Sequence, residues 1–181
     1  MSKLTIGCLM SLDGVVSDPR SWANPYFDAD ATRRSLERLT EVRAMLMGRG
    51  TYEYFAPAWS QPDGPYLERI NALPKYVFSS TLPAVDWDNS ELVTGDAATV
   101  VADLKRDDGG DLVIYGYGGL AQSLLERGLV DELGFWVHPV LLGAGTPAFR
   151  PGERTELRLG EVTPRPTGVV EVTYYPQGQE A

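Results

Sequence analysis

Glycines that follow a short apolar stretch are the first residues of this sequence with types and spacing suited to chemistry. Gly116, Gly118 and Gly119 come directly after the apolar stretch 111–115, and leucines at helical spacing begin at Leu120. Glycine lets the backbone approach a ligand closely, and the free N–H groups at a helix start favour an anion such as phosphate. One glycine cluster is a weak motif, so the pattern predicts either a phosphate-binding turn or a turn without a ligand.

A second turn has the same layout. Gly48, Arg49 and Thr51 follow the apolar stretch 44–47 and precede a short helical stretch that runs towards Phe55. A guanidinium beside a helix start can bind a phosphate through two parallel hydrogen bonds. The alternative interpretation is an exposed arginine next to a threonine that caps the helix.

Two more turns carry polar residues at the ends of expected strands. Ser79 and Ser80 end the stretch 75–80, and residues 11–14 follow the stretch 4–10. The serine hydroxyls fit a contact with phosphate or ribose, or a contact within the turn alone. Turns at the carboxyl ends of parallel strands meet along one edge of a sheet, where α/β proteins bind ligands. Together, the four turns favour a cofactor that carries a pyrophosphate group.

The elements that must position these turns follow from the hydrophobic periodicity. Strands are expected at 4–10, 44–47, 75–80, 91–93, 111–115, 132–142, 155–164 and 169–175, and helices at 27–43, 66–73, 97–104 and from 120 to Gly128. Strands and helices alternate in the first two-thirds of the chain, and strands alone follow. We therefore expect one α/β domain, 1–181, with a mixed, mostly parallel central sheet, flanking helices and antiparallel C-terminal strands.

The composition is that of an ordinary soluble globular protein, with 43% hydrophobic and 23% charged residues. A net charge of −9 without a basic patch argues against a nucleic-acid partner. No apolar run approaches the roughly 18 residues of a membrane span, and no signal segment precedes the first strand. The single cysteine, Cys8, fits a small core residue. We expect a cytoplasmic protein whose partner is a small molecule.

Several motifs, in order along the chain, resemble those of the dihydrofolate reductase superfamily. The branch that they resemble most is similar to the C-terminal reductase domain of the bifunctional riboflavin-biosynthesis deaminase-reductase. The motifs are Ser11-Leu12-Asp13-Gly14, Gly48-Arg49-Gly50-Thr51-Tyr52-Glu53, Lys75-Tyr76-Val77-Phe78-Ser79-Ser80-Thr81-Leu82, the glycine turn with Leu129-Val130-Asp131-Glu132-Leu133, and Pro139-Val140-Leu141-Leu142-Gly143-Ala144-Gly145. The zinc signature of a deaminase half is absent from the sequence, which has one histidine and one cysteine.

The resemblance implies a dihydrofolate-reductase-like fold with NADPH as hydride donor. It places Gly48, Arg49 and Thr51 at the cofactor phosphates, and Ser79 and Ser80 beside the adenosine ribose and its 2′-phosphate. It places the pyrophosphate at the segment Gly116, Tyr117, Gly118, Gly119 and Leu120. The branch often has a small residue where Tyr117 stands, so this ring is expected either to cover the cofactor or to block it. A basic residue is common where Ser80 stands, so selectivity for NADPH is assigned to Arg49, with help from Lys75.

Hydride transfer also needs a proton for the atom next to the acceptor carbon. We assign candidate catalytic roles to Asp13 and Asp28, and we place Leu12 in the wall of the site at the cofactor. The alternatives are a turn aspartate at position 13 and a helix-capping, exposed aspartate at position 28. His138 lies in an apolar strand next to a proline, which favours a structural or interface role over that of a general acid.

The function predicted in this way is an NADPH-dependent reductase of a small heterocyclic or carbonyl substrate. It is similar to the 5-amino-6-(5-phosphoribosylamino)uracil reductase domain of riboflavin biosynthesis. The alternative is a non-catalytic NADP-binding or interaction protein that retains the fold. The apolar strand at 135–137 and the late strands are a candidate homodimer interface, unless one chain buries them.

Overall fold

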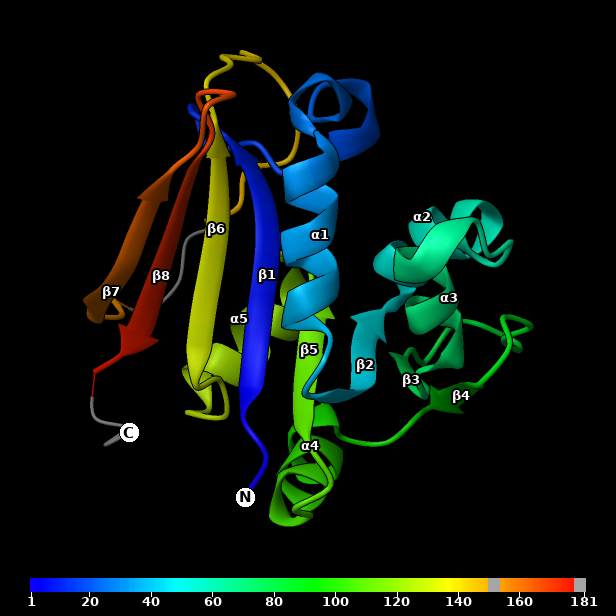
Figure 1. Ribbon diagram of the computed structural model, residues 1–181. Helices are drawn as coiled ribbons and strands as arrows, with labels where there is room; N and C mark the ends of the chain where they lie inside the picture. Colours follow the sequence, from blue (N-terminus) through cyan, green and yellow to red (C-terminus); the bar gives the residue numbers. More distant parts are fainter. Residues whose placement is uncertain (150–153, 178–181) are drawn as a thin grey trace.

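The strongly apolar stretches of the sequence form neighbouring strands of one eight-stranded sheet. In this computed structural model, which describes residues 1–149 and 154–177, the strand order is β4-β3-β2-β5-β1-β6-β8-β7 (Figure 1). The strands are β1 Leu4–Ser11, β2 Val42–Gly48, β3 Lys75–Phe78, β4 Ser90–Val93, β5 Asp111–Tyr115, β6 Glu132–His138, β7 Leu157–Pro164 and β8 Val170–Pro176. All neighbours from β4 to β6 pair in parallel, whereas β8 pairs antiparallel with both β6 and β7. The predicted mixed, mostly parallel sheet with antiparallel C-terminal strands is confirmed.

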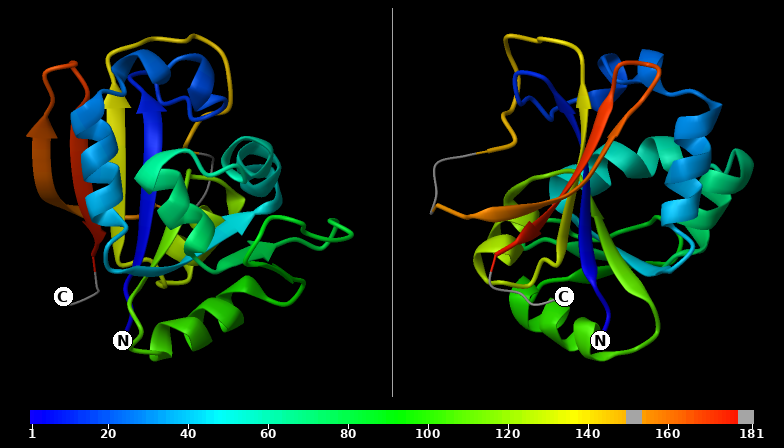
Figure 2. Two further views of the ribbon diagram at one scale, coloured as in Figure 1. Left: turned by 45° about the vertical axis from the view of Figure 1, so that its right-hand side comes forward. Right: turned by 60° about the vertical axis from the view of Figure 1, so that its left-hand side comes forward.

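Helices cover both faces of the parallel part of the sheet (Figure 2). The α-helices are α1 Ala29–Arg38, α2 Arg49–Trp59, α3 Gly64–Ala72, α4 Ala97–Arg106 and α5 Gly119–Glu126. Two short 3-10 turns, η1 Pro19–Ser21 and η2 Asn24–Tyr26, lie in the loop after β1. Gly128 follows α5 with a φ of 68°, as expected of the glycine that ends a helix.

Side-chain alternation along the strands divides the core between two helix layers. In β2, Leu46 packs with Ile114 and Leu124 on the side of α4 and α5, while Met45 and Met47 pack on the side of α2 and α3. All of these side chains are buried. Because both faces of β2 and β5 are covered, these strands read as continuous apolar runs in the sequence.

The first helix is shorter than predicted, and the strand after it begins earlier. The expected helix 27–43 is α1, which ends at Arg38, and Val42 already belongs to β2. A turn in which the N–H of Val42 donates to the carbonyl of Leu39 separates the two elements. Val42 was assigned to a helix face because its spacing fits one, but a β-branched side chain is equally suited to the buried start of a strand.

Two other boundaries correct the sequence interpretation. The short helical stretch expected to run towards Phe55 is α2, which includes Pro57 and continues to Trp59 because Tyr52 and Ala56 pack into the core on that side. The expected strand 132–142 ends at His138, since Pro139 has no N–H to donate to a neighbouring strand.

Candidate functional site

The predicted ligand turns lie at one edge of the sheet, where the parallel strands end. Gly48 ends β2 and precedes α2, while Gly118 follows β5 and precedes α5. Because β2 and β5 are neighbours, the two helix starts come together. A Cβ added to Gly48 would lie 3.8 Å from the Cβ of Leu120, the second residue of α5. The fold therefore brings two of the predicted cofactor turns side by side.

Both helix starts have features that suit an anionic group. Within the part of the chain that the structure describes, no side chain caps the N-terminus of α2 or of α5. Cβ atoms added at Gly50, Gly116, Gly118 or Gly119 would meet no atom within 4 Å. The turns thus border open space, and the first N–H groups of each helix have no intrahelical acceptor. This arrangement fits the pyrophosphate of a dinucleotide cofactor.

Arg49 and Ser79 lie close together beside the start of α2. The Nη1 of Arg49 donates to the Oγ1 of Thr81 at 3.0 Å, and its Nε donates to the Oε1 of Glu53 at 2.8 Å. The Oγ of Ser79 accepts hydrogen bonds from the N–H groups of Thr81 and Leu82. The structure therefore joins the second and third predicted turns through the guanidinium. Ser80 and Thr51 are adjacent in sequence to this group, with Ser80 exposed and Thr51 in the first turn of α2.

Lys75 does not face this edge, so its assigned help in cofactor selectivity is wrong. Its side chain is 1% exposed. Its Nζ donates to the carbonyls of Asn71, Leu73 and Asp88 at 2.8–3.1 Å. Burial lowers the pKa of Lys75 to about 8. The lysine therefore ties the end of α3 to the loop before β4, a role that sequence spacing does not reveal.

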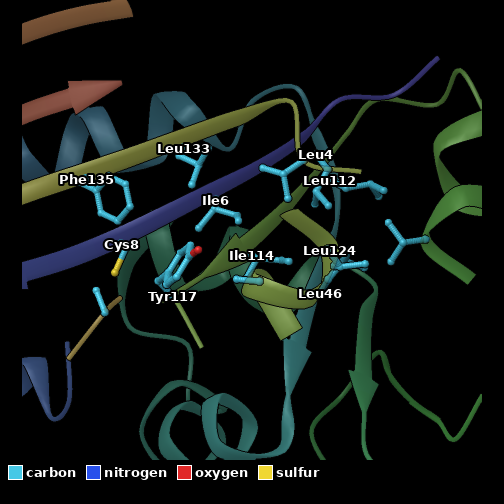
Figure 3. Close-up of a cluster of buried hydrophobic side chains, with 14 of the residues drawn as sticks. Leu4, Ile6, Cys8, Leu46, Leu112, Ile114, Tyr117, Leu124, Leu133 and Phe135 are labelled. Carbon is cyan, nitrogen blue, oxygen red and sulfur yellow. The ribbon is translucent and has the colours of Figure 1, made fainter. Parts of the chain in front are cut away.

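Tyr117 neither covers nor blocks the open space at the glycine turn, because its ring is turned into the core. The side chain is 9% exposed and belongs to the cluster that contains Cys8 and Ile114 (Figure 3). Its ring centroid lies 6.1 Å from that of Phe135 and 5.7 Å from that of Phe149. Burial raises the pKa of Tyr117. The buried ring of Tyr117 thus anchors the turn to the core, and the neighbouring glycines border the open space.

A cavity of about 660 Å³ lies next to the turns, on the face of the sheet that carries α1, α2 and α3. Gly7 and Leu9 of β1 and Tyr115 and Gly116 at the end of β5 are among its lining residues. Eight of its lining residues are aromatic, namely Phe27, Tyr54, Phe55, Trp59, Tyr66, Tyr115, Trp136 and Tyr175. This volume and lining are typical of a small-molecule site.

Five of these rings, Tyr54, Phe55, Trp59, Tyr66 and Tyr115, form one connected group. Phe55 and Trp59, one turn apart on α2, stack with centroids 3.9 Å apart. Trp59 meets Tyr66 and Tyr115 edge to face, at 5.9 and 6.2 Å. None of these residues is among the site residues predicted from the sequence. The i, i+4 pair Phe55 and Trp59 was the available indication.

The loop after β1 closes one side of the cavity by contacts with α2. The guanidinium of Arg20 lies 3.9 Å from the ring centroid of Tyr54 and donates to the carbonyl of that residue. The hydroxyl of Tyr54 accepts a hydrogen bond from the N–H of Arg20 at 2.9 Å and contacts Asp18 at 3.3 Å. The loop and the helix are thus joined across the cavity. This contact gives the loop a defined position.

Asp13 is engaged with the backbone of a neighbouring loop. Its carboxylate accepts hydrogen bonds from the Oγ of Ser11 at 2.6 Å and from the N–H groups of Leu142 and Gly143. These hydrogen bonds, led by that of Ser11, lower its pKa from 3.8 to about 2. A carboxylate with this pKa stays ionised at neutral pH, so the geometry favours the turn role over proton donation. Leu12 beside it is 63% exposed, and its N–H donates to the carbonyl of Val140.

We expect Asp13→Asn to weaken the acid dependence of stability. A pKa depressed in the folded state contributes stability that is present above about pH 4 and lost as the pH falls through about 2. The difference in melting temperature between the wild type and Asp13→Asn should therefore shrink as the pH falls from 4 to 2. Thermal unfolding at stepwise pH measures this difference, and a constant difference would contradict it.

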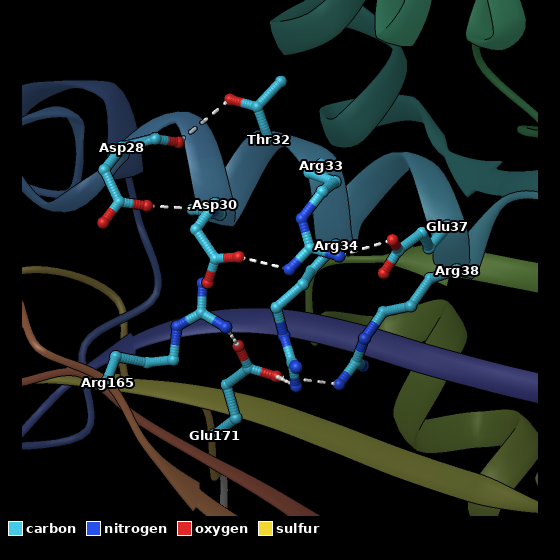
Figure 4. Close-up of polar contacts among 10 residues, drawn as sticks. Asp28, Asp30, Thr32, Arg33, Arg34, Glu37, Arg38, Arg165 and Glu171 are labelled. Carbon is cyan, nitrogen blue, oxygen red and sulfur yellow. Dashed lines mark hydrogen bonds and ion pairs between the residues drawn. The ribbon is translucent and has the colours of Figure 1, made fainter.

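Asp28 is the N-cap of α1, as the capping alternative predicted. Its Oδ1 accepts a hydrogen bond from the N–H of Ala31 at 2.7 Å (Figure 4). The residue is exposed. The structure thus supplies a structural reason for an aspartate here, and the catalytic assignment stays a prediction.

Asp28→Ala is expected to lower the free energy of unfolding by about 1 kcal/mol, because a capping hydrogen bond is lost. Asp28→Ser keeps a capping oxygen without the carboxylate and should restore most of this stability. Urea unfolding measures both variants. If Asp28→Ser folds like the wild type but loses NADPH-dependent turnover more than tenfold, the carboxylate is catalytic after all.

His138 is fully buried at the end of β6, which supports the structural interpretation. Its ring meets Trp22 and Tyr26 edge to face, at 5.2 and 5.4 Å. Its Nδ1 lies 2.9 Å from the carbonyl oxygen of Trp136. Burial lowers the pKa of His138. The imidazole packs the loop after β1 onto the sheet.

Within residues 1–149 and 154–177, no group of three or more histidine, cysteine, aspartate or glutamate residues is placed to hold a metal ion. In the same residues, no helix is both long and apolar enough to cross a membrane.

Comparison with known proteins assigns the chain to a family. The sequence profile of the RibD C-terminal domain matches residues 2–170. This chain belongs to the RibD C-terminal domain family. The match spans every turn at the carboxyl edge of the sheet, and it confirms the resemblance drawn from the motifs.

Proteins of similar sequence and structure agree with this assignment. The uncharacterized protein YyaP of Bacillus subtilis is 28% identical over 146 residues, 77% of each chain. A solved structure from Shewanella sp. PV-4, described as a 'putative riboflavin biosynthesis protein', has a TM-score of 0.75 at 25% identity and covers 97% of this chain and 99% of that one. The deaminase/5-amino-6-(5-phosphoribosylamino)uracil reductase of Thermotoga maritima has a TM-score of 0.67 at 14% identity over 97% of this chain and 56% of its own. The chain therefore has the reductase-type fold of the RibD C-terminal domain family.

Proposed function

We propose that this RibD C-terminal domain protein is an NADPH-dependent reductase of a small heterocyclic or carbonyl compound. The observation that carries the proposal is the pair of adjacent, uncapped helix starts beside the aromatic cavity. The glycine turns suit an anion, and the cavity suits a flat acceptor. A cofactor and its substrate must lie in contact for hydride transfer, and these two sites share Gly116.

In this proposal the chain binds and orients, and NADPH supplies the hydride. The backbone at Gly48 and at Gly116, Gly118, Gly119 and Leu120 holds the phosphates. Arg49, with Thr51, Ser79 and Ser80, holds the phosphate and ribose of the adenosine end. The loop after β1, joined to α2 through Arg20 and Tyr54, limits the entry of water to the cavity.

The test is the stabilisation of the purified protein by reduced cofactors. NADPH at 1 mM should raise the melting temperature by several degrees, because a ligand that binds only the folded state stabilises it. NADH at the same concentration should raise it much less. If neither nucleotide raises the melting temperature, the proposal is wrong.

Arg49→Gln is expected to lower the affinity for NADPH by roughly 10–100-fold and to change the affinity for NADH little. The reason is the loss of charge-assisted hydrogen bonds to the 2′-phosphate, which contribute about 1.5–3 kcal/mol. Isothermal titration of both nucleotides measures the two affinities. Glu53→Gln, which removes only the carboxylate paired with Arg49, is the matched control and should retain NADPH selectivity. An equal loss for both nucleotides in Arg49→Gln would contradict this assignment.

The second candidate is a non-catalytic NADP-binding protein. It is favoured by the engagement of both candidate carboxylates, Asp13 and Asp28, in structural hydrogen bonds. It predicts NADPH binding without turnover of any acceptor. The size of the cavity favours the reductase, because a protein without a substrate has no need to keep this space open.

We also propose that the protein is a homodimer that associates through the edge strand β7. The predicted interface at 135–137 is corrected in part, since Phe135 and Trp136 are buried within the chain. Leu159 and Val162 of β7 are 53% and 49% exposed. Apolar residues on an open edge strand favour association. Size-exclusion chromatography with light scattering decides between monomer and dimer.

A further inference from the structure

The proposed reduction needs a proton donor, and the carboxylates chosen from the sequence are engaged elsewhere. Asp13 is held by Ser11 and by the loop at 142–143, and Asp28 caps α1. Other carboxylates also line the cavity, but Asp111 and Glu132 begin β5 and β6 at the opposite edge of the sheet, Glu41 precedes β2 at that same edge, and Glu161 lies in β7. The tyrosines of the cavity wall are therefore the candidate proton donors.

Three tyrosines line the cavity near this edge, namely Tyr54, Tyr66 and Tyr115. The hydroxyl of Tyr54 is engaged with Arg20 and Asp18 of the loop. The rings of Tyr66, on α3, and Tyr115, at the end of β5, both meet Trp59 edge to face, and each tyrosine influences the pKa of the other. Unlike Tyr54, these two tyrosines make no hydrogen bond to the loop after β1 within the described residues.

Tyr115 occupies the boundary between the cavity and the glycine turn. It is the last residue of β5 and directly precedes Gly116. Its ring lies against β1, since a Cβ added to Gly7 would be 3.4 Å from two of its ring carbons. Trp59 meets the ring edge to face. A compound bound between these rings would have the hydroxyl on one side and the proposed cofactor turn on the other.

The charges of the cavity argue against a phosphorylated substrate. Its two arginines are both engaged, Arg20 on the ring and carbonyl of Tyr54 and Arg38 on the buried carboxylate of Glu171 at 3.0 Å. A phosphate needs cationic donors that are directed at it. Stacked rings, in contrast, bind planar aromatic compounds without a charge.

We propose that the cavity takes a planar, uncharged ring compound with a conjugated C=O or C=N bond, and that the Tyr115 hydroxyl donates the proton to its oxygen or nitrogen. Tyr66 is a positioning residue that orients this hydroxyl. The inference rests on the proposed function, which supplies the hydride.

The reaction balances as a two-electron reduction. The acceptor carbon gains the hydride that NADPH supplies, and the C=O or C=N π bond breaks. The neighbouring oxygen or nitrogen gains the proton of the Tyr115 hydroxyl, so an alcohol or amine and NADP⁺ result. The Tyr115 oxygen regains a proton from solvent by way of Tyr66. The high pKa of both tyrosines, raised by burial, keeps them protonated at neutral pH.

Binding is tested with two naphthalene probes that differ by one phosphate group. Isothermal titration of the NADPH-loaded protein should show binding of 1-naphthol at least tenfold tighter than that of 1-naphthyl phosphate. Tighter binding of the phosphate ester, or binding of neither probe, overturns the substrate class. Stabilisation by NADPH is measured on the same sample, so a failure of the proposed function is recognised separately.

Proton donation is tested with isatin, a planar, uncharged ring ketone, as acceptor. Tyr115→Phe should lower kcat by roughly 100-fold, as loss of a general acid does, with KM changed less than threefold. Tyr66→Phe should lower kcat less and shift its pH profile. Tyr76→Phe, on the opposite face of the sheet, is the matched control and should change neither constant.

An unchanged kcat in Tyr115→Phe overturns the proton-donating role. A rise in KM with an unchanged kcat overturns it too, because the hydroxyl would then only bind. A wild-type protein that binds NADPH but does not reduce isatin overturns the acceptor class.

Discussion

Gly118→Val is expected to lower the affinity for NADPH by roughly 100-fold while the protein stays as stable as the wild type. Gly118 has a φ of −129°, a conformation that valine adopts readily. A Cβ at this position meets no atom within 4 Å. The structure itself therefore gives no reason for a glycine here.

The expected loss comes from the ligand that the open space would hold. A valine side chain would keep a phosphate from the first N–H groups of α5, and charge-assisted hydrogen bonds contribute about 1.5–3 kcal/mol each. Each 1.4 kcal/mol lost is a tenfold loss of affinity. Gly118→Ala, with a smaller side chain, should lie between the wild type and Gly118→Val.

Isothermal titration with NADPH measures these affinities, and urea unfolding measures stability. Equal NADPH affinity in all three proteins would show that the turn does not bind the cofactor. A large loss of stability in Gly118→Val would instead show that the glycine is structural.

Glu171→Gln is expected to lower the free energy of unfolding by about 3–5 kcal/mol. The carboxylate of Glu171 in β8 is 4% exposed and lies within 3.1 Å of the guanidinium nitrogens of Arg34, Arg38 and Arg165 (Figure 4). Removal of one charge from a buried cluster leaves its partners without compensation. In Glu171→Gln, Asp30 is the carboxylate that still pairs with Arg165.

The matched control is Glu37→Gln on the exposed side of α1. Glu37 pairs with Arg33, and both side chains are more than half exposed, so its loss should cost less than about 1 kcal/mol. Urea unfolding of both variants at pH 7 measures the difference. Equal stability of the two variants would show that burial does not strengthen the cluster around Glu171.

The sheet order and the two helix layers follow closely from what the sequence predicts. Alternation of buried positions, as at Met45 and Leu46, requires helices on both faces of the sheet. The glycine turns lie where a parallel sheet places them. The ends of the elements were less predictable. By local pattern, Val42 fits a helix or a strand equally well, and Pro57 fits a helix or a loop equally well.

The positions of the glycine turns were predictable because the backbone determines them, whereas the directions of the side chains around them were not. Tyr117 and Lys75 look like ligand residues by position, yet both side chains are turned inwards. The local sequence does not determine the direction of these side chains, since it depends on packing against distant residues such as Phe135 and Trp87. The aromatic cavity was missed for the same reason, because Trp59, Tyr66 and Tyr115 meet only in the folded chain.

We propose that the two glycine turns hold NADPH with its reactive ring facing the aromatic cavity. A crystal structure of the protein soaked with NADPH tests this claim most directly. We predict density for the pyrophosphate at the starts of α2 and α5 and for the nicotinamide beside Tyr115, with the cavity open next to it. A cofactor bound elsewhere, or a nicotinamide that faces a cavity closed by side chains, would contradict the account.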